Sequence, residues 1–130
     1  MKLVWTNGCF DVLHRGHFEM LKYAKSLGDY LIVGIDSDQK VKKDKGEKRP
    51  YNSVQDRKFA LRCIKYVDRV LIFDSRAELE QLIRLLEPDY MVIGSDWKGK
   101  EVVGESYCTE LKFFDRIDGY STTNILENTE

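Results

Sequence analysis

Apolar residues come in short runs that alternate with stretches of helical spacing. Leu3-Val4-Trp5 is a short run that ends at Asn7-Gly8, and residues 30–35 form a nearly continuous one, typical of a strand buried on both faces. Between them, over residues 16–27, Phe18, Leu21, Ala24 and Leu27 recur every three residues. This spacing predicts an amphipathic helix that stops at Gly28.

The same alternation continues along the rest of the chain. Further strands are expected over residues 67–73, 90–93 and 110–114, and further helices over 78–86 and 122–127. Another helix is expected after Ser53, which approximates a capping box with Asp56. Its buried side is expected to come from Phe59, Leu61, Cys63 and Ile64. Residues 40–49 (KVKKDKGEKR) are polar and contain a glycine, so we expect a loop there.

Strands that alternate with helices indicate β-α-β units. We therefore expect an α/β fold: a Rossmann-like, doubly wound parallel sheet of five strands with helices on both faces, formed by a single domain over residues 1–130. Such folds bind ligands at the carboxyl ends of the strands, where the strand order reverses. In this chain the segments with distinctive polar residues and glycines follow the first, second and fourth expected strands and precede the last expected helix. This placement predicts a site at that edge of the sheet.

Composition excludes several classes of function. The 130 residues are 42% hydrophobic, and 21 basic against 22 acidic residues leave a net charge of −1, which argues against a nucleic-acid-binding protein. No segment resembles a signal peptide or a membrane span. Three scattered cysteines without a C-x-x-C pair fit reduced thiols, so we expect a cytoplasmic protein without a membrane partner.

Both histidines of the chain lie at the start of the first helix. His14 and His17 are three residues apart behind a strand, where backbone N–H groups and the helix dipole favour anions. Two imidazoles there could donate to phosphate oxygens, and Gly16 between them lets a phosphate approach the backbone. A zinc site would need a third ligand, for which Asp11 is the only nearby candidate, so no protein-held metal is predicted.

This loop resembles the H-x-G-H signature of the nucleotidyltransferase superfamily. The longer form G-x-F-D-x-x-H-x-G-H, typical of its cytidylyltransferase-like branch, is present as Gly8, Phe10, Asp11, His14, Gly16 and His17. The resemblance implies catalytic roles for the two histidines and places the neighbouring Thr6 and Cys9 in the nucleotide site. It also implies Mg²⁺ that accompanies the nucleoside triphosphate.

Other segments extend this resemblance. The segment from Arg116 to Thr123 is similar to the family's R-x-x-G-x-S-T-T pattern, in which Arg116, Ser121, Thr122 and Thr123 would bind phosphates. In the basic segment 40–49 the resemblance points to Lys45 as the lysine that reaches the phosphates. Arg57 matches a family arginine near the nucleotide. Gly94, Asp96 and Trp97 lie in the turn that, by this resemblance, would lie along the nucleoside.

The resemblance implies transfer of a nucleoside monophosphate from ATP or CTP to a phosphorylated sugar or polyol, with release of pyrophosphate, by a homodimer. Thr6–Asp11, Lys45-Gly46, Val102–Gly104 and Gly119–Ile125 favour the adenylyltransferase domain of ADP-heptose synthases, which use ATP and heptose 1-phosphate. Asp96–Lys100 and Arg116 favour glycerol-3-phosphate cytidylyltransferases. A non-catalytic nucleotide sensor and a flavodoxin-like module are the alternatives from other classes.

Overall fold

The computed structural model describes residues 1–115 of the chain. Five strands form one sheet in the order β3-β2-β1-β4-β5, and every neighbouring pair is parallel. The strands are β1 (Leu3–Gly8), β2 (Tyr30–Asp36), β3 (Arg69–Phe73), β4 (Tyr90–Gly94) and β5 (Glu110–Phe114). The order reverses at β1, and this confirms the predicted Rossmann-like parallel sheet.

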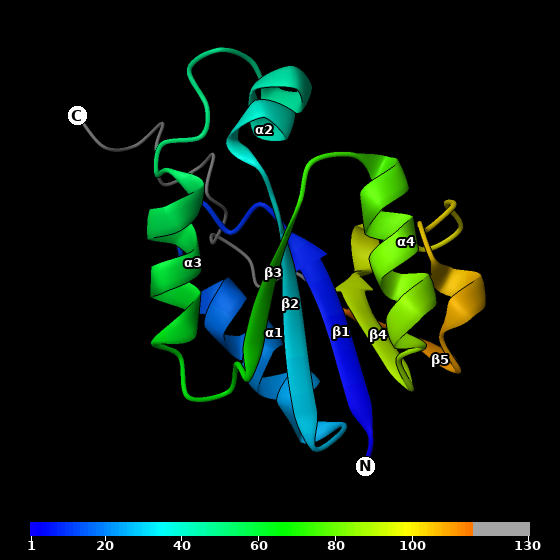
Figure 1. Ribbon diagram of the computed structural model, residues 1–130. Helices are drawn as coiled ribbons and strands as arrows, with labels where there is room; N and C mark the ends of the chain where they lie inside the picture. The colour runs from blue at the N-terminus through cyan, green and yellow to red at the C-terminus, as the bar shows by residue number, and fades with distance from the viewer. Residues whose placement is uncertain (116–130) are drawn as a thin grey trace.

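Helices cover both faces of the sheet, as predicted (Figure 1). They are α1 (Arg15–Ser26), α2 (Asp38–Lys45), α3 (Val54–Arg62) and α4 (Arg76–Leu86), with 3₁₀ turns at Ser95–Trp97 and Glu105–Tyr107. Leu21 of α1 and Leu61 of α3 belong to one buried apolar cluster, and Ile83 of α4 belongs to the other. Each cluster fills one face of the sheet with apolar side chains. A ligand site is therefore expected among the loops at the carboxyl ends of the strands.

Three of the helices begin at a serine that caps them. The hydroxyl oxygen accepts a hydrogen bond from the backbone N–H three residues later, in the pairs Ser37–Lys40, Ser53–Asp56 and Ser75–Glu78. The cap satisfies a donor that the helix leaves unpaired. The cap predicted at Ser53 is confirmed. The helix predicted over 122–127 lies outside the described residues.

The prediction of a loop over residues 40–49 is wrong for its first half. Helix α2 runs through Lys45 and lies beyond the carboxyl ends of the strands in Figure 1. Its one buried residue is Val41, so the segment has no apolar periodicity that a sequence pattern could reveal. The Ser37 cap and the ion pairs of Lys40 with Asp36 and Asp44 stabilise it instead. Residues 46–49 lie outside any helix or strand.

The predicted buried side of α3 is also partly wrong. Phe59 is 72% exposed and Cys63 is exposed, whereas Leu61 is buried as expected. The buried face instead pairs Leu61 with Arg57, four residues earlier and 1% exposed. On α1, Phe18 is 42% exposed although its spacing placed it on the buried stripe.

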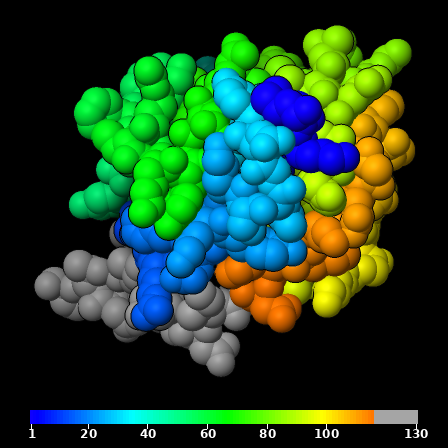
Figure 2. Space-filling model, turned by 90° about the horizontal axis from the view of Figure 1, so that it is seen from below, coloured from blue at the N-terminus to red at the C-terminus, as the bar shows by residue number. Residues whose placement is uncertain are grey.

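The amino ends of the strands are closed by polar contacts. The carbonyl of Lys2 accepts from the N–H groups of Asp29 and Tyr30, and the Asp89 carboxylate accepts from the Leu3 N–H at 2.7 Å. Figure 2, which views the molecule from below, shows the first residues at this surface against the segment that leads into β2. Over residues 1–115, no helix has the length and apolar character that crossing a membrane requires.

Candidate active site

His14 and His17 form a reciprocal cap at the start of α1. The Nδ1 atom of His14 accepts from the Gly16 N–H at 3.0 Å, and the Nδ1 atom of His17 accepts from the His14 N–H at 3.2 Å. The two rings lie with centroids 3.9 Å apart. Because each Nδ1 acts as an acceptor, the proton of each neutral ring sits on Nε2. His17, but not His14, lines the cavity described below.

Both imidazoles resist protonation. Burial, followed by the nearby His14 and Lys45, lowers the pKa of His17 to about 4, and burial lowers the pKa of His14. Near neutral pH the pair is therefore uncharged. Neutral donors suit a site in which charge on phosphate oxygens develops during a reaction and relaxes afterwards.

The loop before α1 has a strained conformation. Phe10 has φ of 51°, in the left-handed region that non-glycine residues rarely adopt, and it is 4% exposed. Its ring lies 5.3 Å from the His17 ring. A Cβ atom at Gly8 would lie 3.2 Å from the Phe10 ring, so the glycine leaves room for this packing. Such strain persists where the surroundings enforce it, often at ligand sites.

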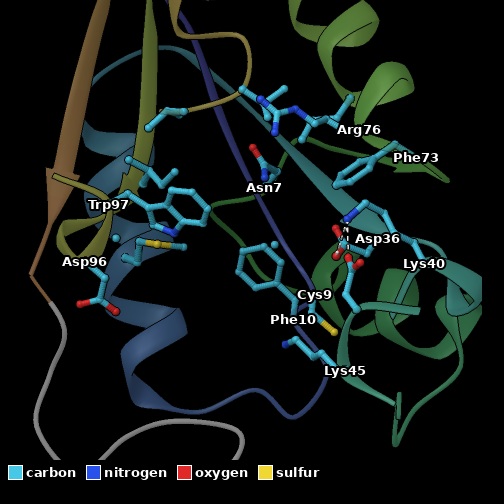
Figure 3. A pocket seen from close by; sticks show the side chains of 18 of the residues that line it. Asn7, Cys9, Phe10, Asp36, Lys40, Lys45, Phe73, Arg76, Asp96 and Trp97 are labelled. Carbon is cyan, nitrogen blue, oxygen red and sulfur yellow. Dashed lines mark hydrogen bonds and ion pairs between the residues drawn. The ribbon is translucent and has the colours of Figure 1, made fainter. Parts of the chain in front are cut away.

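A cavity of about 620 Å³ opens at the carboxyl ends of the strands, next to these residues (Figure 3). Its size suits a nucleotide with a small second substrate. The predicted site residues that line it are Gly8, Cys9, Phe10, His17, Lys45, Gly94, Asp96 and Trp97. They come from the end of β1 and the loop after it, the start of α1, the end of α2, and the end of β4 with the turn that follows. The fold thus brings together segments far apart in the sequence.

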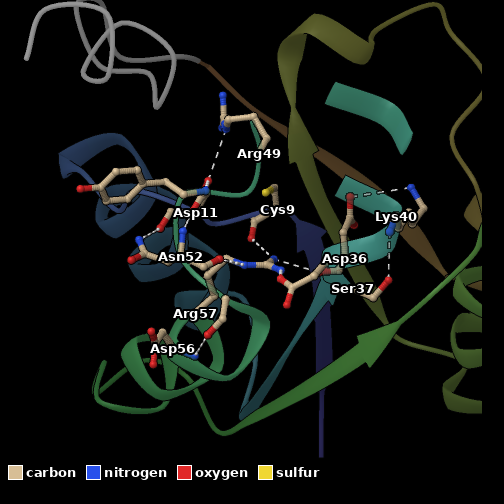
Figure 4. A network of polar contacts seen from close by, with 12 residues as sticks. Cys9, Asp11, Asp36, Ser37, Lys40, Arg49, Asn52, Asp56 and Arg57 are labelled. Carbon is tan, nitrogen blue, oxygen red and sulfur yellow. Dashed lines mark hydrogen bonds and ion pairs between the residues drawn. The ribbon is translucent and has the colours of Figure 1, made fainter. Parts of the chain in front are cut away.

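Arg57 has a different environment from the one predicted. Its buried guanidinium donates from Nη1 to the carbonyls of Cys9 (2.9 Å) and Asp36 (2.8 Å), from Nε to the Asn52 carbonyl, and from Nη2 to the Asp38 carboxylate (2.8 Å) (Figure 4). Arg57 does not line the cavity. It joins the ends of β1 and β2 and thereby fixes two walls of the site.

Thr6 and Asp11 are likewise buried and bonded within the protein. The Thr6 hydroxyl donates to the Val92 carbonyl at 2.8 Å and so joins β1 to β4. The Asp11 carboxylate accepts from the N–H groups of Tyr51 (2.6 Å) and Asn52 (2.7 Å). Neither residue lines the cavity. Both hold the frame around the nucleotide site that the sequence predicted.

Comparison with protein families now decides the class of this site. The model of the family described as cytidylyltransferase-like matches residues 5–128. The chain belongs to the cytidylyltransferase-like family. The predicted enzyme class, a nucleotidyltransferase, is thereby confirmed, as is the resemblance on which that prediction rested.

Curated relatives show which members of the cytidylyltransferase-like family this chain is similar to. The chain is 49% identical over 95% of its length to the bifunctional protein HldE of Campylobacter fetus, and 48% identical over 97% to that of Helicobacter pylori. It spans 27% of the length of each. Among solved structures, the lipopolysaccharide core biosynthesis protein of Thermoplasma volcanium superposes with a TM-score of 0.75 at 26% identity, covering 91% of this chain and 99% of that one.

Part of the predicted cytidylyltransferase-like site falls outside the structure. Arg116, Ser121, Thr122 and Thr123 lie beyond the described residues, so their phosphate-binding roles stay predictions. Gly16 is described, and its N–H donates to His14.

Sequence reasoning missed residues on the side of the cavity formed by β2, α2, β3 and α4. They are Asp36, Lys40, Asp44, Phe73, Arg76 and Leu79. The positions of Asp36 and Phe73 at strand ends were a usable signal, because parallel strands place their carboxyl ends at one edge. Burial raises the pKa of the Asp36 carboxyl group and that of the Cys9 thiol in this cavity.

Within residues 1–115, no group of three or more His, Cys, Asp or Glu side chains could hold a metal ion.

Proposed function

We propose that the chain transfers AMP from ATP to heptose 1-phosphate and releases pyrophosphate. The observation that carries the proposal is the reciprocal histidine cap at the start of α1, which holds the His17 ring, protonated on Nε2, at a cavity of nucleotide size that Lys45 also lines. The high identity to HldE proteins and the fold of a lipopolysaccharide core biosynthesis protein support this acceptor class. The proposal includes a cytoplasmic location and a homodimer.

The reaction needs placement and charge stabilisation rather than proton transfer. An oxygen of the acceptor's phosphate is already ionised near neutral pH and attacks the α-phosphorus of ATP. The new O–P bond forms as the bond from the α-phosphorus to the bridging oxygen breaks, and pyrophosphate leaves with that bond's electron pair. No general base is required, which agrees with the neutral, poorly basic histidines.

The chain's own donors would act where charge accumulates. His14 and His17 donate from Nε2 to oxygens of the α-phosphate, while the Lys45 ammonium neutralises the leaving pyrophosphate. Arg116, Ser121, Thr122 and Thr123 would complete the phosphate site. Mg²⁺ bound to the triphosphate would supply further neutralisation of its charge.

Glycerol-3-phosphate cytidylyltransferase activity is the second candidate. Asp96–Lys100 reads D-W-K-G-K, and the 3₁₀ turn Ser95–Trp97 brings Trp97 to the cavity wall. If this turn meets the base, Trp97 rather than the first loop would decide between ATP and CTP.

A pyrophosphate-release assay with four NTPs against four acceptors tests the proposal. The acceptors are heptose 1-phosphate, glycerol 3-phosphate, ribitol 5-phosphate and phosphocholine. Release with ATP and heptose 1-phosphate is expected. Release with CTP and glycerol 3-phosphate would establish the second candidate. NTP binding without release for any pair would instead identify a nucleotide sensor. Sedimentation of the same preparation tests the dimer.

A further inference from the structure

A cluster of charged side chains lines the cavity on the side away from Trp97. Asp36, Lys40 and Asp44 are spaced four residues apart, and the carboxylates of Asp36 and Asp44 both lie near the Lys40 ammonium group. The Lys40 Nζ atom lies 2.7 Å from an Asp44 oxygen and 3.7 Å from an Asp36 oxygen. Figure 3 shows Asp36 and Lys40 beside Phe73, with Trp97 across the cavity. The phosphate chemistry described above uses none of these side chains.

The charge of this cluster is unsuited to phosphate. Asp36, Lys40 and Asp44 carry two carboxylates against one ammonium. The Lys45 cation also acts electrostatically on Asp36, and Arg76, which lines the same side, is paired with Glu101. A phosphate at the cluster would be repelled, because like charges in a partly buried site interact strongly. The cavity therefore separates an anion-binding region from an acceptor-rich region, and the second fits an uncharged part of a substrate that carries hydrogen-bond donors.

Asp36 is the member of the cluster best placed to accept such donors. Its side chain is only 16% exposed, and the 3.7 Å separation from Lys40 is longer than a hydrogen bond. Asp44 is already engaged at 2.7 Å and is 46% exposed. Burial raises the pKa of Asp36, although the nearby cations Lys40, Lys45 and Arg57 act in the opposite direction. Hydroxyl groups of a ligand would supply the missing hydrogen bonds.

The backbone holds Asp36 rigidly. Its carbonyl accepts from Arg57 Nη1 at 2.8 Å, and its partner in the sheet register is Phe73 on β3. Phe73 and Leu79 form an apolar wall of the cavity beside the carboxylate. A carboxylate next to an apolar wall suits a sugar ring, whose hydroxyl edge is polar and whose C–H face is apolar.

We infer that Asp36 is a specificity-determining residue that binds the hydroxyl groups of the sugar acceptor, on the opposite side of the cavity from the nucleoside. The inference rests on the proposed function, because it names the part of the acceptor that this side of the cavity receives. Asp36 thus selects a polyhydroxylated acceptor, while His14, His17 and Lys45 act on its phosphate and on ATP.

Steady-state kinetics of Asp36→Asn test this assignment. The variant is nearly isosteric but lacks the charge, and it replaces one acceptor oxygen by a donor. The KM for heptose 1-phosphate should rise roughly 10- to 100-fold, as for loss of a hydrogen bond to a charged group. The KM for ATP should stay within about twofold. Glu47→Gln is the matched control, because Glu47 is exposed, lies outside the cavity and undergoes the same change of charge.

Direct binding of heptose 1-phosphate, measured by calorimetry, separates this inference from the proposed function. If wild-type protein binds the sugar phosphate but releases no pyrophosphate, the proposed reaction fails, whereas weakened binding by Asp36→Asn still supports the inference. Unchanged acceptor affinity in Asp36→Asn overturns the inference, as does a selective rise in the KM for ATP. Absence of wild-type binding overturns both.

A stability control excludes a purely structural explanation. Asp36→Asn removes only the long Lys40–Asp36 ion pair of α2, so it should melt close to wild type, as should Asp36→Glu. Asp36→Glu, with its carboxylate displaced by one methylene, should fall between wild type and Asp36→Asn in acceptor KM. Equal losses in both variants together with lowered melting temperatures would assign Asp36 to α2 stability and overturn the inference.

Discussion

The imidazole rings of His14 and His17 lie 3.9 Å apart, and the Nδ1 atom of each accepts a backbone N–H at the start of α1. One hydrogen-bonded unit thus caps the helix and fixes the tautomer of two donors. The same residues therefore serve local folding and chemistry. Conventional alanine substitution would remove both roles together, so a variant that separates them is needed.

His17→Asn makes that separation. An asparagine side-chain oxygen lies near the position of Nδ1 and can accept from the His14 N–H, but nothing replaces the Nε2–H donor. We expect turnover to fall roughly 100- to 1000-fold, by analogy with loss of an oxyanion-hole donor. The melting temperature should stay close to that of wild type.

His17→Ala provides the comparison, because it loses cap and donor together. It should match His17→Asn in turnover and melt at a lower temperature, while NTP affinity falls by less than turnover in both variants. Near-normal turnover in either variant would contradict a catalytic role for His17. Pyrophosphate release and differential scanning fluorimetry measure the two effects separately.

The lowered pKa of His17 predicts a stability that falls with acidification. In the unfolded chain the imidazole takes up a proton near pH 6.5, whereas in the folded protein it does so only near pH 4. Between these values the unfolded state binds more protons, so the free energy of unfolding decreases as pH falls, by at most about 1.4 kcal/mol per pH unit from this group.

Urea denaturation of wild type and His17→Asn between pH 4 and 7 measures this contribution. The difference in stability between the two proteins should shift in favour of the variant as pH falls through this window. A constant difference would show that His17 titrates normally in the folded state.

Arg57→Lys should destabilise the protein although it keeps the charge. The Arg57 guanidinium donates to three carbonyls and to Asp38 from a fully buried position. A lysine ammonium cannot reproduce this fork, so buried acceptors lose their partners. We expect a loss of about 2–4 kcal/mol in the free energy of unfolding.

Arg62→Lys is the matched control for Arg57→Lys. Arg62 lies on the same helix but is exposed, and such surface changes stay within about 0.5 kcal/mol. Equal effects of the two substitutions, measured by chemical denaturation, would contradict the structural role of Arg57. If Arg57→Lys instead had the stability of wild type and a raised KM for the NTP, this result would support the contact between Arg57 and the nucleotide that the sequence predicted.

The sequence predicts the parts of this molecule that depend on local or periodic signals. Strand β2, the cap at Ser53 and the histidines behind β1 follow from apolar runs, capping chemistry and spacing. The edge of the sheet that carries the cavity follows from the parallel topology. These features required no knowledge of distant contacts.

The remaining features depend on tertiary contacts. Helix α2 buries only Val41 and is stabilised by its cap and ion pairs, so its polar pattern is indistinguishable from a loop. The burial of Arg57 depends on carbonyls contributed by Cys9 and Asp36, far away in sequence. A pattern of residue types cannot distinguish such an internal cation from one that faces a ligand.

Gly34→Ala should be destabilising because β2 passes directly beneath the Trp5 ring. A Cβ atom at Gly34 would lie 2.5 Å from Cζ2 and 2.6 Å from Cη2 of Trp5, which is fully buried. Overpacking of a core typically costs about 1–3 kcal/mol. The Trp5 Nε1–H donates to Asn7, a cavity-lining residue, so displacement of the indole should also raise substrate KM values.

A double-mutant cycle with Trp5→Phe tests that explanation. Phenylalanine lacks the part of the indole that the new methyl group would strike, so Gly34→Ala should cost less in the Trp5→Phe background than in wild type. The coupling energy, obtained from denaturation of the four proteins, should favour the double variant by about 0.5–3 kcal/mol. Additive effects would show that the cost of Gly34→Ala arises elsewhere, for example at Phe73, whose ring lies 3.3 Å from the same Cβ position.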